Sequence, residues 1–287
     1  MTARDTLLAA LTSIVWGLAF LATRFGLDGF TATQLLALRF LIASVPVLFL
    51  TRPALPWTRL VAIGLTLFVG QFLLLFLAYR AGMPPGVASV TQQSQVFMTV
   101  LLAVILFGER PSRQQRGGMA LAAAGLGLVA LTTGADLPLR ALLLALSGAF
   151  SWAIGNVLLR QAQGVSMLAL ISWASLVPPV PMLLLSAFWG EASLPVAIQQ
   201  ASWTSLGAAV YLGAAATPLF ALWGGLLRRY PAASVAPLAL LAPVTGVVAS
   251  AVVFGEQFSA TRLAGMALIL AGLAVIVVRW GRWSIRR

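Results

Sequence analysis

The sequence contains no cysteine and no histidine, and all of its 18 basic residues are arginines. Disulfides, thiolate nucleophiles, imidazole bases and the common zinc ligands are therefore excluded. Acidic residues are nearly as scarce and stand singly along the chain. The six are Asp5, Asp28, Glu109, Asp136, Glu191 and Glu256. We expect no metal, no cofactor and no enzymatic activity, because no catalytic constellation can be assembled from these residues.

Charged residues make up only 8% of the 287 residues, whereas 61% are hydrophobic. Soluble domains are about half apolar and about one quarter charged, so this chain is not a soluble globule. A helix that crosses a bilayer takes roughly 20 residues, and ten such helices would leave only short connections. We expect an all-α integral membrane protein that is embedded in the lipid bilayer.

Apolar runs bounded by arginine, proline, glycine or acids predict ten transmembrane helices. Those of the first half lie near residues 5–24, 33–51, 58–80, 86–106 and 114–132. Those of the second half lie near residues 139–159, 166–187, 203–226, 232–253 and 260–280. The first run has no clear signal-peptide cleavage site, so we interpret it as a retained span. Three prolines within residues 177–181 predict one kinked helix or two short pieces in the seventh run.

The arginines predict the orientation of the chain. With ten spans both termini share a face, which would hold Arg4, Arg52, Arg59, Arg110, Arg113, Arg116, Arg160, Arg228, Arg229, Arg279, Arg282, Arg286 and Arg287. The other face would hold Arg24, Arg80, Arg140 and Arg262. Positive residues favour the cytoplasmic side, so we expect both termini in the cytoplasm. Nucleic-acid binding is not expected, because the arginines lie in separate clusters between apolar runs.

The chain contains an internal repeat. Trp16 and Arg24 correspond to Trp152 and Arg160 at an offset of 136 residues. The segments 107–109 and 254–256 both read Phe-Gly-Glu, at an offset of 147 residues, and the same offset relates the Gly-Met-Ala segments at 118–120 and 265–267. Five spans in each half would make the second half enter the membrane from the opposite side. This pattern predicts an inverted repeat, with a substrate site near the midplane between the halves.

With these repeated segments and Pro243, the sequence resembles the EamA family of the drug/metabolite transporter superfamily over essentially its whole length. Within that family it is most similar to the bacterial aromatic amino acid and paraquat exporters. The resemblance implies two EamA repeats, at 1–135 and 136–287, in a multi-pass carrier of the bacterial inner membrane that exports amino acids or other small metabolites. One departure is Val96, which stands where the second repeat has Pro243, so a proline bend is expected only in the ninth span.

The polar run in the fourth span is the first candidate substrate site. Gln92, Gln95 and Thr99 fall on one helix face and could bind the ammonium and carboxylate of a zwitterion. The equivalent wall of the ninth span offers Ala239 and Ala242, which leave room for a bulky side chain. The alternative is that the polar stripe only forms hydrogen bonds between helices.

Aromatic residues at equivalent repeat positions are the second candidate. Trp16 and Phe20 stand one helical turn apart, as do Trp152 and Asn156, and could stack on a ring or bind an ammonium group. Simple packing is the alternative for these side chains. Further candidates that carry a polar group on a buried segment are Gln71, Tyr79 and Tyr211.

Arg39 is the single basic residue well inside an apolar run. We expect it to reach the outer interface or to pair with an acid such as Asp28, and less strongly to attract a substrate carboxylate. Glu109 and Glu256 follow span ends and are expected to cap the next helix. Gly118 and Gly125, with the equivalent Gly265 and Gly272, predict close helix contacts, either within the fold or between protomers.

No predicted span carries an acid near its centre, so no proton carrier is evident. We expect alternating access by two rocking halves that move substrate down its gradient or by weak exchange. A carrier of nucleotide sugars or other phosphorylated metabolites, a broad exporter of drugs or organic cations, and a channel stay open as alternatives. The sequence does not fix the oligomeric state, with a monomer as one option.

Overall fold

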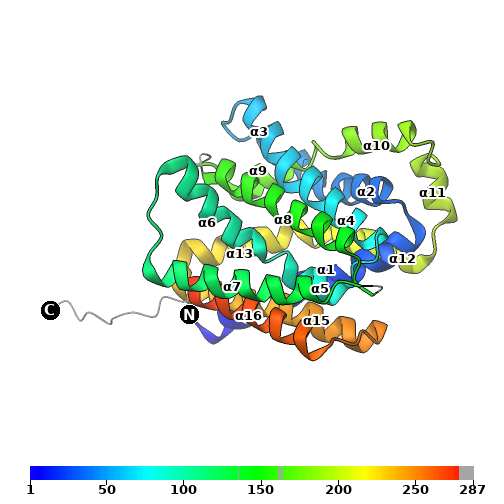
Figure 1. Cartoon of the computed structure of the whole chain (residues 1–287). Coiled ribbons are helices and arrows are strands. Elements are labelled where there is room, and N and C mark those ends of the chain that lie inside the picture. The colour runs from blue at the N-terminus through cyan, green and yellow to red at the C-terminus, as the bar shows by residue number, and fades with distance from the viewer. Residues whose placement is uncertain (135, 161, 163, 278–287) are drawn as a thin grey trace.

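The computed structural model describes residues 1–134, 136–160, 162 and 164–277, and the final ten residues, which include the end of the predicted tenth span, lie outside this part. Every regular element in the described part is a helix (Figure 1). The first half holds α1 (Ala3–Gly29), α2 (Ala32–Ser44), η1 (Val45–Phe49), α3 (Trp57–Ile63), η2 (Gly64–Gly70), α4 (Gln71–Arg80), α5 (Pro85–Thr91), α6 (Ser94–Phe107) and α7 (Arg113–Leu131). The second half holds α8 (Leu139–Arg160), α9 (Met167–Ala174), α10 (Pro179–Phe188), α11 (Leu194–Gln200), α12 (Trp203–Ala214), α13 (Ala216–Arg229), α14 (Ala232–Val235), η3 (Ala236–Leu240), α15 (Leu241–Phe254) and α16 (Ala260–Val277).

Capping residues explain where several helices begin and end. Thr31 and Ser112 each accept the backbone N–H of the glutamine three residues later, and that glutamine bonds back to the cap. These two capping boxes fix the starts of α2 and α7. At the other end, the repeated Phe-Gly-Glu segments place Gly108 and Gly255 in the left-handed region, at φ 64° and 65°. Because glycine adopts this conformation without a steric penalty, both segments end their helices in the same way.

Nine helical segments in the described part are long and apolar enough to cross a membrane. The predicted span that is not among these nine is the fifth, near residues 114–132, which corresponds to α7, whose 19 residues begin with Arg113, Gln114, Gln115 and Arg116. This polar first turn lowers the hydropathy of α7, so the ten-span count is not reproduced by length and composition alone. The seventh predicted run forms one span from Met167 to Phe188, which is divided into α9 and α10 around Pro178. An all-α membrane protein is confirmed.

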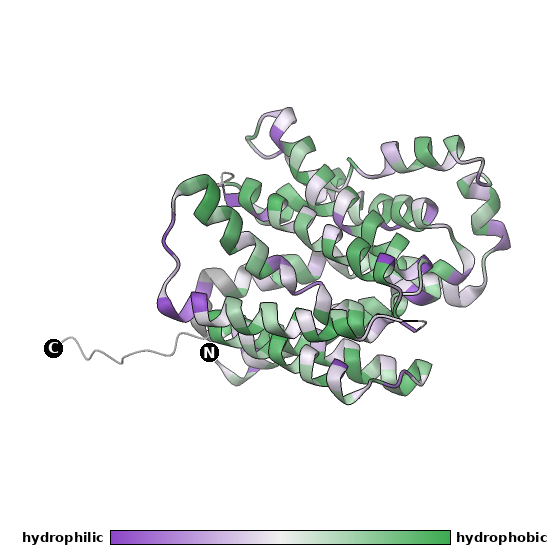
Figure 2. Cartoon of the chain, viewed as in Figure 1, coloured by the Kyte–Doolittle hydropathy of each residue, from purple (hydrophilic) through white to green (hydrophobic). Residues whose placement is uncertain are grey.

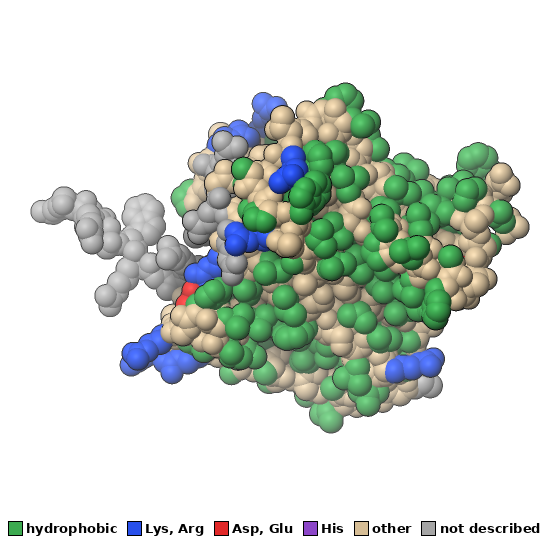
Figure 3. All heavy atoms as spheres, turned by 90° about the horizontal axis from the view of Figure 1, so that it is seen from above, with side chains coloured by type: hydrophobic (Ala, Val, Ile, Leu, Met, Phe, Trp, Pro, Cys, Tyr) green, Lys and Arg blue, Asp and Glu red, His purple; other side chains and the backbone are tan. Residues whose placement is uncertain are grey.

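The outer surface of the fold is apolar. Hydrophobic residues follow the helices, whereas hydrophilic residues gather in connections such as the one between α6 and α7 (Figure 2). Large side chains are left outside the core, including Phe49 at 83% exposure and Phe188 at 84%. Figure 3 shows hydrophobic side chains over much of the visible face, with most visible arginines towards one end. Such a surface suits a hydrocarbon environment and would be costly in water.

The contact between α7 and α16 shows that the two halves are inverted relative to one another. A Cβ on Gly118 would lie 2.6 Å from the carbonyl oxygen of Gly272, and one on Gly125 would lie 2.5 Å from that of Gly265. Residue numbers rise along one helix as they fall along the other, so the helices are antiparallel. Each glycine also meets the repeat counterpart of the other, as an approximate two-fold axis requires. The close approach therefore occurs within the fold.

The two repeats interleave, because the first helix of each packs on the other repeat. α1 packs along α15, where a Cβ on Gly17 would lie 2.7 Å from the Cβ of Thr245. α8 packs along α6 in the equivalent way. A buried apolar core runs through both halves and includes Leu35, Phe76 and Leu142. The interleaving places residues of both repeats around the centre of the molecule.

We predict that Gly125→Ala destabilises the protein, whereas Gly127→Ala on the same helix does not. The Cβ at 125 would meet backbone atoms of Gly265 and Ile269, which cannot move aside without separating α7 from α16, while no atom of the described residues lies within 4 Å of a Cβ at 127. Overpacking costs about 1–3 kcal/mol, and alanine is the better helix former at an open position. Thermal unfolding of both variants in detergent checks this. Equal midpoints would contradict the tight α7–α16 contact.

Candidate functional site

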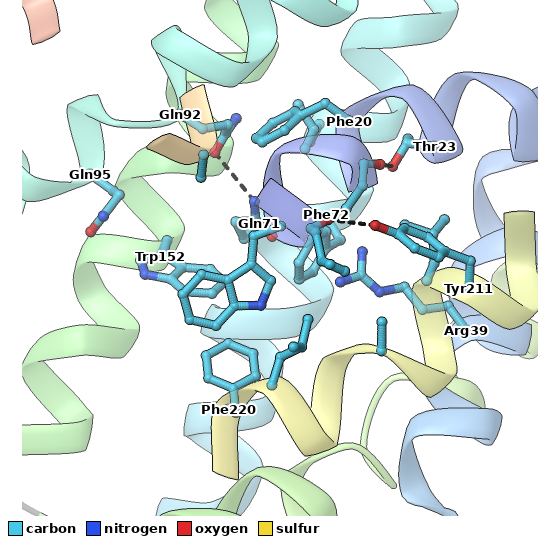
Figure 4. Close-up of a pocket in the computed structure, with 18 of the residues that line it drawn as sticks. Phe20, Thr23, Arg39, Gln71, Phe72, Gln92, Gln95, Trp152, Tyr211 and Phe220 are labelled. Carbon is cyan, nitrogen blue, oxygen red and sulfur yellow. Dashed lines mark hydrogen bonds between the residues drawn. The ribbon is translucent and has the colours of Figure 1, made fainter. Parts of the chain in front are cut away.

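A cavity of about 290 Å³ lies between the two repeats (Figure 4). It is bordered by α1, α2, α4, the junction of α5 and α6, α8, α12, α13 and the junction of η3 and α15. The lining residues are Val15, Trp16, Ala19, Phe20, Thr23, Arg39, Gln71, Phe72, Leu75, Gln92, Gln93, Gln95, Trp152, Tyr211, Leu212, Ala215, Leu219, Phe220, Ala239 and Ala242. Nine of our twelve candidates border this cavity: Trp16, Phe20, Gln71, Gln92, Gln95, Trp152, Tyr211, Ala239 and Ala242.

Two broken helices meet at the cavity. The fourth span breaks at Gln92 and Gln93 between α5 and α6, and the offset of 147 carries this break onto Ala239 and Leu240, where η3 passes into α15. The fourth span therefore also breaks, although it lacks the proline from which a bend was expected only in the ninth span. The break in the fourth span needs no proline, because backbone hydrogen bonds to the residue three positions earlier form there. One of them runs from the Gln93 N–H to the Val90 carbonyl oxygen at 3.0 Å. Discontinuous helices at equivalent positions are typical of transporter binding sites.

Hydrogen bonds of Gln92, at this break, connect helices that form the cavity wall. Gln92 donates from Nε2 to the carbonyl oxygen of Ala145 on α8 at 3.0 Å, and its Oε1 accepts from Nε2 of Gln71 at 3.3 Å. Both ends of the Gln92 amide are thus used within the fold. The Oε1 of Gln71, in contrast, is buried and has no hydrogen-bond partner among the described residues. Gln71 therefore presents a free acceptor beside the cavity.

A second polar group joins α6 to α8. Asn156 donates from Nδ2 to Gln95 Oε1 at 2.8 Å and to Thr99 Oγ1 at 3.2 Å. Gln95 borders the cavity, but Thr99 and Asn156 are not part of its lining. The polar stripe on the fourth span accordingly forms hydrogen bonds between helices, which the sequence offered as the alternative, and two of its residues also border the cavity.

Aromatic side chains form another part of the lining. The Trp16 ring lies 5.3 Å from that of Phe220 and 5.2 Å from that of Trp223, and Trp152 meets Phe72 edge to face at 6.1 Å. These distances are those of favourable aromatic pairs. The repeat-related tryptophans therefore both border the cavity while each packs against a further ring.

The two tyrosines among our candidates, Tyr79 and Tyr211, are placed differently. Tyr211 lines the cavity, and its hydroxyl donates to the carbonyl oxygen of Val15 at 2.6 Å. Tyr79 donates to the carbonyl oxygen of Phe20 at 3.0 Å and borders a second, separate cavity together with Arg24 and Glu256. The structure therefore does not bring Tyr79 to the main cavity.

Arg39 also lines the cavity, contrary to our expectation of an acidic partner or an interface position. Asp28 pairs with Arg24 instead, one helical turn earlier on α1. The guanidinium of Arg39 stacks on the Phe72 ring, 3.8 Å from its centroid, and the side chain is buried. Sequence reasoning marked Arg39 as unusual but did not place it here. Phe72 and Phe220 were missed altogether, because nothing distinguishes them from other apolar residues of their spans.

Glu109 and Glu256 do not cap the helices that follow them, so this expectation is wrong. Glu109 pairs with Arg160 at 2.5 Å. Glu256 accepts the backbone N–H of Gly86 at 3.1 Å, at the start of α5 in the other repeat. Burial raises the pKa of the Glu256 carboxyl above its ordinary value. Asp136 behaves in the opposite way, because its hydrogen bond with Arg262 lowers the pKa of its carboxyl.

Apolar spans, an inverted repeat and a cavity bounded by broken helices define a multi-pass membrane protein of the secondary-transporter class. The chain belongs to the EamA-like transporter family, whose profile matches residues 5–131 and 139–278. The resemblance drawn from the repeated motifs is thus confirmed, and the family is one of transporters and not of enzymes.

Several known proteins are similar over nearly the full length. The chain is 38% identical to a probable amino-acid metabolite efflux pump of Salmonella typhimurium, over 96% of each chain. It is 35% identical to one of Escherichia coli strain K12, over 98% of this chain and 97% of the relative. It is 29% identical to a probable terminal-alkyne amino-acid exporter of Streptantibioticus cattleyicolor, over 93% and 91%. A crystal structure at 22% identity shares the fold, with a TM-score of 0.66 over 96% of this chain and 99% of the other.

The opposite pKa shifts of Glu256 and Asp136 predict opposite pH effects on stability. A raised carboxyl pKa stabilises the fold below the unfolded pKa, and this contribution is lost as the pH rises through the folded pKa. A lowered carboxyl pKa contributes stability above the unfolded pKa that is lost on acidification. As the pH falls from 7 to 4 the wild type should gain stability relative to Glu256→Gln, and as it falls further below about 4 the wild type should lose stability relative to Asp136→Asn. Melting curves taken across both ranges check the two signs, and trends of the same sign would refute the assignment.

Proposed function

We propose that this protein exports amino acids, including aromatic and other neutral ones, from the cytoplasm across a bacterial inner membrane. The observation that carries the proposal is the cavity between the inverted repeats, which combines glutamine amides, among them the unpartnered Oε1 of Gln71, with aromatic and small apolar walls. The polar part can bind the ammonium and carboxylate of a zwitterion, and the apolar part can hold its side chain. The relatives support this, since they are named as an amino-acid metabolite efflux pump or an amino-acid exporter.

The size of the cavity supports a small substrate. Its volume of about 290 Å³ is at the lower end of the range for small-molecule sites, which begins near ~300 Å³. A single amino acid suits such a volume better than a nucleotide sugar or a large drug. The site residues that we propose to contact substrate are the nine candidates in the lining, together with Phe72 and Phe220.

Charge in the lining separates the alternatives. Arg39 is the one charged residue among the lining residues that belong to the described part of the chain. A phosphorylated metabolite carries two negative charges and would call for more cationic donors than this single guanidinium. An organic cation would require a carboxylate or a purely aromatic cage, and it would be repelled by Arg39. A neutral zwitterion, which can place its carboxylate near the arginine, is therefore favoured over both.

We propose alternating access as the mechanism. The near two-fold relation between the halves lets each half adopt the conformation of the other, which would expose the cavity first to one side and then to the other. None of the six acids of the sequence lines the cavity. A proton carrier at the substrate site is thus lacking, and the proposed transport follows the substrate gradient or exchanges one substrate for another. We place both termini in the cytoplasm, which agrees with the arginines gathered at one end in Figure 3.

Counterflow in liposomes tests the proposal. Purified protein in vesicles preloaded with unlabelled phenylalanine should accumulate labelled phenylalanine and other neutral amino acids transiently, without an imposed pH gradient, because an exchanging carrier needs only the trans substrate. Paraquat and a nucleotide sugar should give no such transient. Uptake that requires a pH gradient would overturn the uncoupled mechanism, and absence of counterflow with every amino acid would overturn the substrate class.

Trp16→Ala should slow this transport by about ten-fold, whereas Trp203→Ala should leave it within two-fold. Trp16 borders the cavity and holds Phe220 in place, so its removal costs an aromatic pair of about 0.5–1.5 kcal/mol and enlarges the site. Trp203 is 89% exposed and lies away from the cavity, which makes it the matched control. Initial rates are compared at equal amounts of reconstituted protein. Unchanged rates for Trp16→Ala would remove this residue from the proposed site.

A further inference from the structure

Arg39 lies deep in the fold and turned towards the cavity. It is the eighth residue of α2, which begins at Ala32, so it sits about 10 Å along the helix axis from that end. Its side chain is 8% exposed, and Figure 4 shows the guanidinium beside Phe72 and Tyr211 at the cavity. Gly213 on α12 fixes this position, because a Cβ there would lie 2.7 Å from the carbonyl oxygen of Arg39 itself.

Every acidic side chain of the sequence has a partner other than Arg39. Asp28, Glu109 and Asp136 form ion pairs with arginines elsewhere in the fold. The other three accept hydrogen bonds: Asp5 from Tyr230, Glu191 from Thr31 at 2.7 Å, and Glu256 from the Gly86 N–H. No acid within the described residues therefore neutralises the charge of Arg39. Among those residues its only ring contacts are with Phe72, 3.8 Å from the ring centroid, and Phe40, 5.3 Å from the centroid, and stacking on an aromatic ring leaves the N–H edge of a guanidinium free.

Two polar atoms at the cavity complement each other. The Nε of Arg39 is a buried donor without a partner, and the Oε1 of Gln71 is a buried acceptor without one, in the described part of the chain. Both residues line the same cavity. The remaining buried atoms of this kind are hydroxyls of Thr91, Ser94, Ser172 and Ser250, whose desolvation costs less than that of a charge. An unpaired arginine inside a membrane protein is costly, which indicates a partner that arrives with the substrate.

We propose that Arg39 binds the α-carboxylate of the substrate through the edge of its guanidinium, while Gln71 Oε1 accepts a hydrogen bond from the α-ammonium. This assignment rests on the proposed function and narrows it to substrates with a free carboxylate. Arginine and carboxylate form paired, charge-assisted hydrogen bonds, and the stacking on Phe72 holds the guanidinium plane ready for them. Amino-acid amides, esters and decarboxylated amines lack the group that Arg39 recognises and should be poor substrates.

Counterflow with three related compounds tests the proposal on the wild-type protein. L-phenylalanine should be carried, whereas L-phenylalaninamide, which lacks the carboxylate, should show a KM about ten- to one-hundred-fold higher, the range that loss of a charge-assisted bond predicts. 3-Phenylpropanoate, which lacks the ammonium, should also be carried less well. Transport of the amide as good as that of phenylalanine would overturn the role of Arg39 and leave amino-acid export intact. If none of the three is carried, the proposed function itself fails.

Variants of Arg39 test whether this residue distinguishes phenylalanine from phenylalaninamide. Arg39→Gln should raise the KM for phenylalanine by about ten-fold or more and leave that for phenylalaninamide nearly unchanged, because only the first compound loses a partner. Arg39→Lys keeps the charge and should restore part of the preference. Arg140→Gln, at an exposed arginine near the start of α8, serves as the matched control and should behave as wild type. An unchanged KM for phenylalanine in Arg39→Gln overturns the proposal, and if that variant fails to fold, the wild-type comparison of acid and amide decides.

Discussion

The absence of water inside the bilayer is the constraint on which the arrangement of polar side chains depends. A polar group at that depth must find a partner within the fold or face a cavity. Gln92 and Asn156 follow the first course, with bonds that cross between helices of different repeats. Arg39 and Gln71 follow the second, since both line the cavity and each keeps an atom without a partner among the described residues. Hydrogen bonds made by polar side chains thus join the helices near their breaks, and a few polar groups at the cavity are left for a substrate.

The repeat supplies the scaffold, and the differences between its copies supply the site. Glycine contacts between α7 and α16 and the interleaving of α1 with α15 obey the approximate two-fold axis. The lining does not obey it, because Gln92 and Gln95 face a cavity whose opposite wall holds Ala239 and Ala242. A symmetric frame suits a carrier that must open to both sides with similar energy. An asymmetric lining suits a substrate with a polar end and an apolar end.

Periodic and repeated features were predictable from the sequence, whereas contacts between distant residues were not. The spans, the inverted relation and the close contact of the α7 and α16 glycines follow from apolar runs and from motifs at fixed offsets. The break at Gln92 was missed, because no proline marks it and the bond from the Gln92 side chain to Ala145 joins residues far apart in the sequence. The partner of Asp28 was also predicted wrongly, since Arg24 on the same helix lies closer than Arg39. Phe72 carries no signal in one sequence, because its role arises only where the Arg39 guanidinium stacks on it.

The positive charge of Arg39 in the cavity also affects which charge state of a substrate can be exported without energy coupling. A zwitterion has no net charge, so the membrane potential does no work on it, and a carrier without a proton site can still export it down its gradient. A cationic amide or amine leaving a negatively charged cell would oppose about 2.3 kcal/mol for every 100 mV of potential. Arg39 disfavours such cations at the site and, in the proposed mechanism, requires the carboxylate that makes the substrate neutral overall. Recognition of the carboxylate therefore selects the charge state for which uncoupled export is feasible.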